Sequence, residues 1–284
     1  MKQIPVITSN SDNFLQQFGA LYAAFKGIKQ NEQVQFDLSG ANWLCPIVIL
    51  PISAYIAKTS STFVTSNNPT ISGYLNTIDF PNGVHSATAF EKATHERKTY
   101  VPISVLERDK GSEREHLESM FSRLVYRLLG SVPGAQNAVY YPITELVTNI
   151  FEHSGDEAGF VFGQYYTSRK YLDVCIVDIG RGLAAGYKDR MKLELTDGQA
   201  IEEVLKGNST KSNQERGYGI RTSKRVVCEG LGGQFIIISG SSALVSTQSS
   251  EKLVSLPDFY WQGVIVSYRI PKPKDGIDIT SYLE

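Results

Sequence analysis

The chain has 284 residues, of which 42% are hydrophobic and 20% are charged, and its formal net charge is −1. This composition supports a packed core and excludes disorder as the starting assumption. The balanced charge gives no electrostatic drive toward nucleic acid or anionic lipid, so neither a nucleic acid nor a membrane is expected as a partner.

Three cysteines, Cys45, Cys175 and Cys228, are scattered without the spacing of a metal site or of a disulfide framework. We therefore expect three reduced, mostly buried thiols in a cytoplasmic protein. The first residues contain no apolar signal core. The longest apolar run, Trp43–Ile52, is too short to span a bilayer and contains two prolines.

The first hundred residues alternate between helical and strand patterns. Apolar residues at three- and four-residue steps predict a helix over 14–25, and the alternating segment 34–38 predicts a strand. The apolar run 47–56 predicts a buried helix, a brief strand follows at 63–64, and another helix is expected at 71–78. This alternation indicates a small α/β domain.

Residues 81–111 show weak periodicity and are interpreted as a connection, with a strand expected near 100–105. We place a boundary near Lys110–Ser112, which gives a small regulatory domain with its connection over 1–105 and a second domain over 112–284. Because the second part has a periodic core of its own, we expect it to fold without the first.

The second part opens with a helix for which Ser112 and Glu115 predict a capping box. An apolar stripe from Leu117 to Leu128 defines its buried face. The remaining expected elements are helices at 138–153, 199–205 and 220–231 and strands at 159–166, 171–177, 234–239, 243–247 and 263–270.

The second helix carries a polar face. At about 100° per residue, Glu145, Asn149 and Glu152 share that face, whereas Leu146 and Ile150 lie opposite. A carboxylate and a carboxamide one turn apart are a reasonable hard-oxygen set for Mg²⁺. Taken alone, this pattern is better explained by an ordinary amphipathic helix with a solvated face.

An aspartate ends the strand at 171–177 in the segment Asp178-Ile-Gly180-Arg-Gly182. The two glycines allow a close approach of backbone to the carboxylate. The carboxylate can accept a hydrogen bond from an exocyclic amine such as that of adenine. The alternative is a simple Asx-type turn at the end of a strand.

A polar loop over 206–220 ends in Gly217-Tyr-Gly219 at a helix start. Free backbone N–H groups there favour an anion, and Lys211 and Arg216 add positive charge. The alternative is a mobile solvated loop. The Gly-Lys-Ser/Thr ending of a Walker loop is missing, and the Gly-x-Gly follows no strand, which argues against a dinucleotide-binding fingerprint.

In this order and spacing, the three segments resemble the GHKL ATPase superfamily of gyrase-type, chaperone-type, histidine-kinase and mismatch-repair ATPases. The resemblance covers about 113–271, and Glu145–Ser154 is most similar to the anti-sigma-factor serine kinases. It implies a Bergerat α/β sandwich, which has a mixed sheet, helices on one face and the nucleotide between these helices and a lid.

The resemblance also implies roles for individual residues. Glu145 would polarise the attacking water or hydroxyl, Asn149 would hold Mg²⁺, and Asp178 would bind the adenine amino group of ATP. The other cofactor-binding residues that it implies are Gly180 and Gly182, which make room for the base, and Ser209, Thr210, Lys211, Gly217 and Gly219 of the lid.

The N-terminal part, over about 1–84, resembles a STAS domain, the anti-sigma antagonist fold. The segments that carry this resemblance are Asp37–Leu44, the apolar run after it, and Ile71–Phe80. The acceptor serine of that fold would fall near Cys45–Ile47, where no hydroxyl is present. We therefore expect a domain that regulates or recruits and is not itself a phosphate acceptor. The alternative is a generic small α/β domain.

These resemblances imply an Mg-ATP-binding ATPase or protein serine kinase in bacterial-type signalling. Its partners would be ATP and a protein regulator or substrate, and a homodimer is compatible with this reading. Autophosphorylation on histidine is disfavoured, because His95 and His116 lack the pattern of a phosphoacceptor helix. The alternative is a non-catalytic switch that binds a partner with or without nucleotide, since the lid has only one clear Gly-x-Gly.

Overall fold

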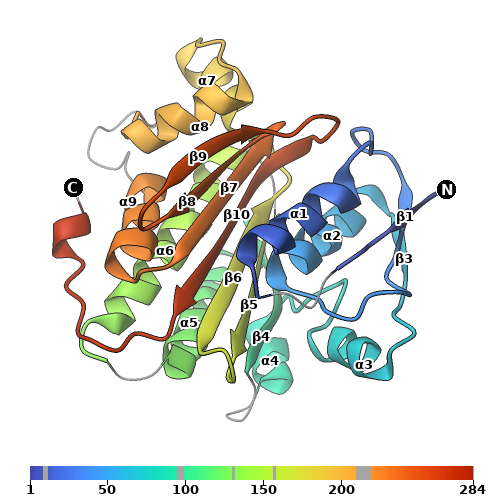
Figure 1. The fold of residues 1–284 in the computed structure, drawn as a ribbon, viewed down its shortest axis with the longest axis horizontal. Coiled ribbons are helices and arrows are strands. Elements are labelled where there is room, and N and C mark those ends of the chain that lie inside the picture. Colours follow the sequence, from blue (N-terminus) through green and yellow to red (C-terminus); the bar gives the residue numbers. More distant parts are fainter. Residues whose placement is uncertain (9–11, 95–98, 130–131, 156–157, 209–218, 284) are drawn as a thin grey trace.

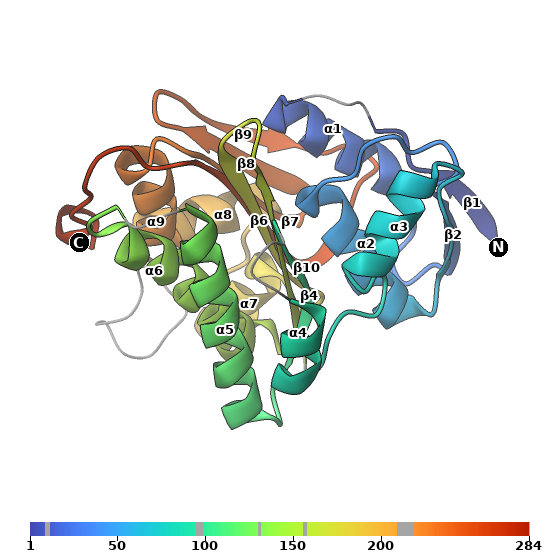
Figure 2. The same cartoon turned by 90° about the horizontal axis from the view of Figure 1, so that it is seen from below.

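The computed structural model of the chain describes residues 1–8, 12–94, 99–129, 132–155, 158–208 and 219–283. Its elements lie in three layers: a small N-terminal α/β unit, a larger β-sheet, and helices on the far side of that sheet (Figures 1 and 2). The α/β class expected from the sequence is confirmed at this level.

The N-terminal unit is built on a parallel sheet in the order β1-β2-β3. Its strands are β1 (Lys2–Pro5), β2 (Val34–Asp37) and β3 (Thr62–Val64), and its helices are α1 (Phe14–Phe25), α2 (Pro46–Thr59) and α3 (Pro69–Thr77). Helix α4 (Ala87–Ala93) follows them in the chain, but its buried Phe90 belongs to the core on the far face of the larger sheet. The predicted elements of this part are confirmed to within a few residues. Helix α4 is not predicted, because its buried stripe consists of Ala87 and Phe90 only.

The larger sheet has seven strands in the order β4-β5-β6-β10-β7-β8-β9. They are β4 (Tyr100–Glu107), β5 (Ala158–Tyr166), β6 (Tyr171–Asp178), β7 (Gln234–Gly240), β8 (Ser242–Thr247), β9 (Glu251–Ser255) and β10 (Trp261–Pro271). Every neighbouring pair is antiparallel, so the expectation of a mixed sheet is wrong. Short connections join β5 to β6, β7 to β8 and β8 to β9, and such hairpins enforce antiparallel pairing.

Helices α5 (Gly111–Leu129), α6 (Ala135–Asn149) and α9 (Gly219–Arg225) lie on one face of this sheet. The π-helical turns η1 (Ile150–Ser154) and η3 (Val226–Gly230) extend α6 and α9, and the remaining helices are α7 (Leu183–Met191), α8 (Asp197–Lys206) and the 3-10 turn η4 (Thr280–Tyr282). Because α5 begins at Gly111, Ser112 lies within its first turn, so the predicted capping box is wrong. The Glu113 carboxylate instead accepts a hydrogen bond from the Ala87 backbone N–H.

Each face of the seven-stranded sheet is covered by a different layer. Along β6, Val174 and Ile176 belong to the core with α5, α6 and α9, whereas Cys175 and Val177 belong to a core with the N-terminal unit. This alternation is the two-residue period of a strand. Helices of the second part therefore cover one face, as predicted, and the N-terminal unit covers the other.

A buried ion pair of the larger sheet also contacts the N-terminal unit. Arg269 of β10 donates from Nε and Nη2 to the two carboxylate oxygens of Asp173, at 2.7 and 2.8 Å. Its Nη2 also donates to Gln17 of α1 at 3.2 Å. Asp173 and Arg269 are 1% and 8% exposed, so loss of either partner would leave a buried charge uncompensated.

The three cysteines are free thiols and all are buried, as predicted. Among the described residues, no helix combines the length and the apolar character needed to cross a membrane.

Candidate functional site

Helix α6 presents Glu145 and Asn149 on its polar face. Both side chains are half-buried, whereas Leu146 and Ile150 on the opposite face are 3% and 4% exposed. The two faces predicted from the sequence are therefore confirmed. Asn149 is the last α-helical residue, and the wider π turn η1 follows it directly. The wider π turn changes the angle between successive side chains, and Glu152 within this turn is exposed, unlike the half-buried Glu145 and Asn149.

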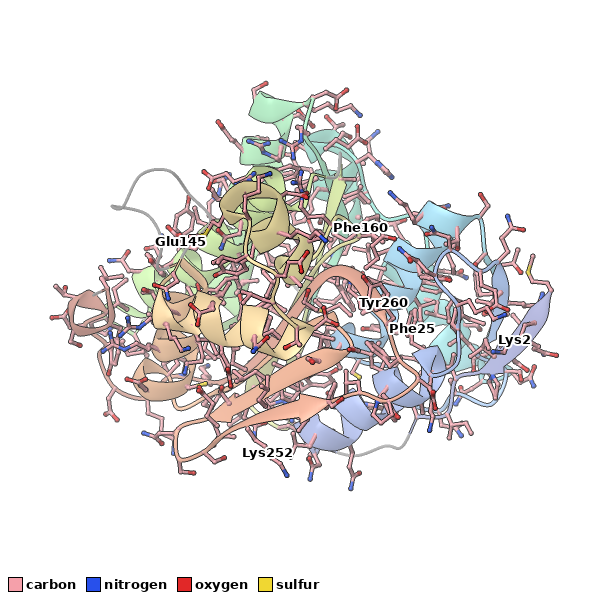
Figure 3. The ribbon with its side chains drawn as sticks, turned by 90° about the horizontal axis from the view of Figure 1, so that it is seen from above. Lys2, Phe25, Glu145, Phe160, Lys252 and Tyr260 are labelled. Carbon is pink, nitrogen blue, oxygen red and sulfur yellow. The ribbon has the colours of Figure 1, made fainter. Side chains whose placement is uncertain are left out.

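Gly219, the first residue of α9, lies directly against this polar face. A Cβ atom at Gly219 would be 2.6 Å from Glu145 Oε2 and 3.2 Å from Asn149 Nδ2. Contacts as short as 2.6 Å are not tolerated by real Cβ atoms, so only glycine fits without a shift. Three of the predicted site residues thus meet, although one of them comes from a distant part of the chain. Figure 3 shows Glu145 on α6, well apart from Phe25 and Tyr260.

The environment of Glu145 includes the half-buried phenol of Tyr141. Tyr141 lies one helical turn before Glu145, so the two side chains share a face. Burial raises the pKa of Tyr141, and the negative charge of Glu145 raises it further. The phenol is a neutral hydroxyl group at physiological pH, and interaction with the Thr222 hydroxyl of α9 lowers its pKa slightly against these two effects.

Asp178 is the last residue of β6 and is 4% exposed. It follows Val174 and Ile176 at two-residue steps, so its side chain belongs to the sheet face that carries α6. Its Oδ1 accepts a hydrogen bond from the backbone N–H of Gly180 at 2.9 Å. The Asx-type turn considered as an alternative is therefore present, and it fixes the direction of the carboxylate rather than excluding a ligand contact.

Gly182 ends the turn and begins α7. Its φ of +77° is one that L side chains rarely adopt, which explains why glycine is needed there. The hydroxyl of Ser239 in β7 accepts a hydrogen bond from the Leu183 N–H at 3.0 Å and donates one to the Gly263 carbonyl at 2.9 Å. This serine therefore joins the turn to β10.

The end of α6 and the Asp178 turn are neighbours. Gly159 of β5 pairs with Asp178, and a Cβ at Gly159 would be 2.8 Å from Cδ1 of Ile150. From the turn itself, the guanidinium of Arg181 packs against Gly155, just after η1. The sheet register thus brings the polar end of α6 to the side of the Asp178 turn.

Of the remaining predicted lid residues, Ser209, Thr210, Lys211 and Gly217 lie outside the described residues. Within the described part of the chain, no group of three His, Cys, Asp or Glu side chains could hold a metal ion.

Sequence reasoning missed two neighbours of Asp178 on β10. Trp261 donates its indole N–H to the Asp178 carbonyl at 3.0 Å, and Gly263, with φ +110°, leaves no room for a Cβ beside Asp178. A signal was present, because a buried tryptophan needs an acceptor for its N–H.

The chain matches no protein-family model, and no curated protein matches it either.

Proposed function

We propose that the chain binds Mg-ATP and acts as a GHKL-type ATPase or protein serine kinase. The observation that carries this proposal is the meeting of Glu145, Asn149 and Gly219 at the end of α6. A carboxylate, a carboxamide and a backbone segment without a side chain suit a metal-bound phosphate group, and a side chain at Gly219 would displace the Glu145 carboxylate.

In this proposal the bound Mg²⁺ would neutralise charge on the phosphates. Asn149 would be its amide ligand, and Glu145 would accept a proton from a water or a serine hydroxyl. Asp178 would accept a hydrogen bond from the adenine amino group, with its carboxylate already oriented by the Gly180 N–H. The neutral phenol of Tyr141 would add a donor beside Glu145.

The alternative is a non-catalytic switch that binds a partner protein with or without nucleotide. It is favoured by one observation, which is that the N-terminal unit shares a core with the sheet that carries Asp178. Cys45, near the position where a STAS-like acceptor would fall, is 1% exposed within this core. A buried thiol cannot receive a phosphoryl group, which supports a regulatory unit that acts through contact.

A steric substitution tests the site. Gly219→Ala places a Cβ 2.6 Å from Glu145 Oε2, whereas Gly186→Ala, in helix α7, meets nothing within 4 Å and is the matched control. Calorimetric titration with Mg-ATP and an assay of phosphate release should show turnover lowered about 10²-fold by Gly219→Ala, since a misplacement of about 1 Å can cost that much. The control should behave as wild type.

Absence of Mg-ATP binding by the wild type would refute the ATPase or kinase function. Identical turnover in the two variants would refute a reaction at Gly219. Binding without phosphate release or transfer to any tested protein would favour the switch over the enzyme.

A further inference from the structure

The turn that carries Asp178 depends on a side chain from the last strand of the sheet. The ladder between β6 and β10 ends at the pair Val177–Ile265, and the register of β10 against β7 shifts between Trp261 and Val264. Asp178 therefore lies beyond the last paired residue on this side. The Trp261 indole N–H bonds the Asp178 carbonyl at 3.0 Å and replaces the missing backbone donor. Both residues are buried, so neither group has water as a substitute partner.

The indole ring is in turn held by the N-terminal unit. Phe25, the last residue of α1, packs edge-on against Trp261 with ring centroids 5.4 Å apart. Phe25 also contacts Phe36 of β2 at 5.4 Å and Tyr55 of α2 at 5.5 Å. One phenylalanine thus joins α1, β2 and α2 to the ring that supports the Asp178 turn.

This contact lies at the seam between the two layers. Phe25, Trp261 and Tyr260 line a narrow cleft there together with Ile179, the residue after Asp178. Figure 3 shows Phe25 and Tyr260 side by side at this seam. A displacement of α1 would therefore reach Trp261 directly and, through its hydrogen bond, the strand end.

We propose that Trp261 is a positioning residue through which the N-terminal unit regulates the Asp178 turn. The regulatory meaning rests on the proposed function, in which this turn reads adenine. A partner protein that moves α1 would loosen the Phe25–Trp261 contact, free the Asp178 carbonyl and disorder the carboxylate. Nucleotide affinity would fall as a result, without any contact between the partner and the nucleotide.

The direct test is amide hydrogen exchange of the full chain without nucleotide. Trp261→Phe keeps an aromatic ring and removes the N–H donor. Trp43→Phe is the matched control, because the Trp43 indole N–H has no acceptor in the structure. We expect amides of the segment 178–183 to exchange about three- to ten-fold faster in Trp261→Phe, as for one lost hydrogen bond, and at the wild-type rate in the control.

A second variant tests the origin of the effect in the N-terminal unit. Phe25→Leu keeps apolar volume and removes the edge-on ring contact. It should also accelerate exchange over 178–183, and it serves as the test if Trp261→Phe does not fold. Unchanged exchange in Phe25→Leu would overturn the coupling, and unchanged exchange in Trp261→Phe would overturn the positioning role.

Nucleotide titrations separate this inference from the proposed function. The chain has two tryptophans, so Trp43→Phe leaves Trp261 as the sole indole fluorophore. ATP should change its emission, and Trp261→Phe should bind ATP about three- to ten-fold more weakly than the control. Accelerated exchange with no ATP binding in any variant would refute the nucleotide function alone. Normal ATP binding with unchanged exchange would refute the positioning role alone.

Discussion

Deletion of the N-terminal unit is the strongest perturbation that the fold suggests. A fragment that begins at Tyr100 keeps all seven strands of the larger sheet and every helix from α5 onward. The deletion removes α1 and α2, which cover the face opposite α6, and the segment around Val84, whose backbone bonds that of β4. The periodic core of the second part predicts that such a fragment folds, whereas the core shared between the two parts predicts that it does not.

The magnitude follows from the apolar side chains that the deletion uncovers. Six large ones, each at most 6% exposed, are Phe160, Phe162, Val177, Ile179, Trp261 and Ile265. Burial of such a side chain contributes about 1.5–3 kcal/mol, so the six together contribute roughly 9–18 kcal/mol. Even half of this loss is comparable to the whole stability of a domain, about 5–15 kcal/mol. The deletion also removes Gln17 from the buried Arg269–Asp173 pair.

Far-ultraviolet circular dichroism with thermal melting is the assay. We expect the fragment to aggregate or to lack a cooperative transition, and residues 1–99 supplied in trans to restore one, because they return the missing half of the core. A cooperative melt of the fragment alone, within about 5 °C of the full chain, would show that the shared core is not required and would support an independent second domain.

Three further predictions concern single residues. Asp178→Asn keeps an acceptor for the Gly180 N–H but loses the charge, so ATP affinity measured by calorimetry should fall by about 1.5–3 kcal/mol, and equal affinity for GTP would contradict adenine reading. Glu145→Ala should lower turnover about 10²–10⁴-fold and leave Mg-ATP binding nearly intact. Asn149→Ala should lower turnover and also weaken Mg-ATP binding. Unchanged turnover in Glu145→Ala would exclude helix α6 from catalysis. Burial raises the pKa of Glu118 to about 7 in the folded chain, whereas an unfolded chain loses this proton from about pH 4. The free energy of unfolding therefore falls as pH rises from about 4 to about 7, because the folded state disfavours the charged carboxylate. Glu118→Gln should therefore raise the melting temperature at pH 8 and leave it unchanged at pH 4, and parallel pH profiles would show that Glu118 does not titrate in this way.

Most of the local elements and the faces that they bury can be predicted from the amino-acid sequence. The helix over 14–25, the buried helix after Cys45 and the strands that became β5 and β6 follow from apolar spacing, which acts within one element and needs no partner to be recognised. The same reasoning separated Glu145 and Asn149 from the buried face of α6. The Asp178 turn was also predictable, because a short polar side chain and spaced glycines after a strand favour a local hydrogen bond.

Which of these elements meet depends on contacts between distant parts of the chain. Every residue of β6 is buried, which indicates that both of its faces are covered, but the sequence does not say that α6 covers one and the N-terminal unit the other. The antiparallel strand order, the approach of Gly219 to Glu145 and the bond from Trp261 to Asp178 all join residues far apart in the chain. Such contacts are selected by the free energy of burying both faces of one sheet at once, and that choice is made among whole arrangements of strands rather than within any one segment.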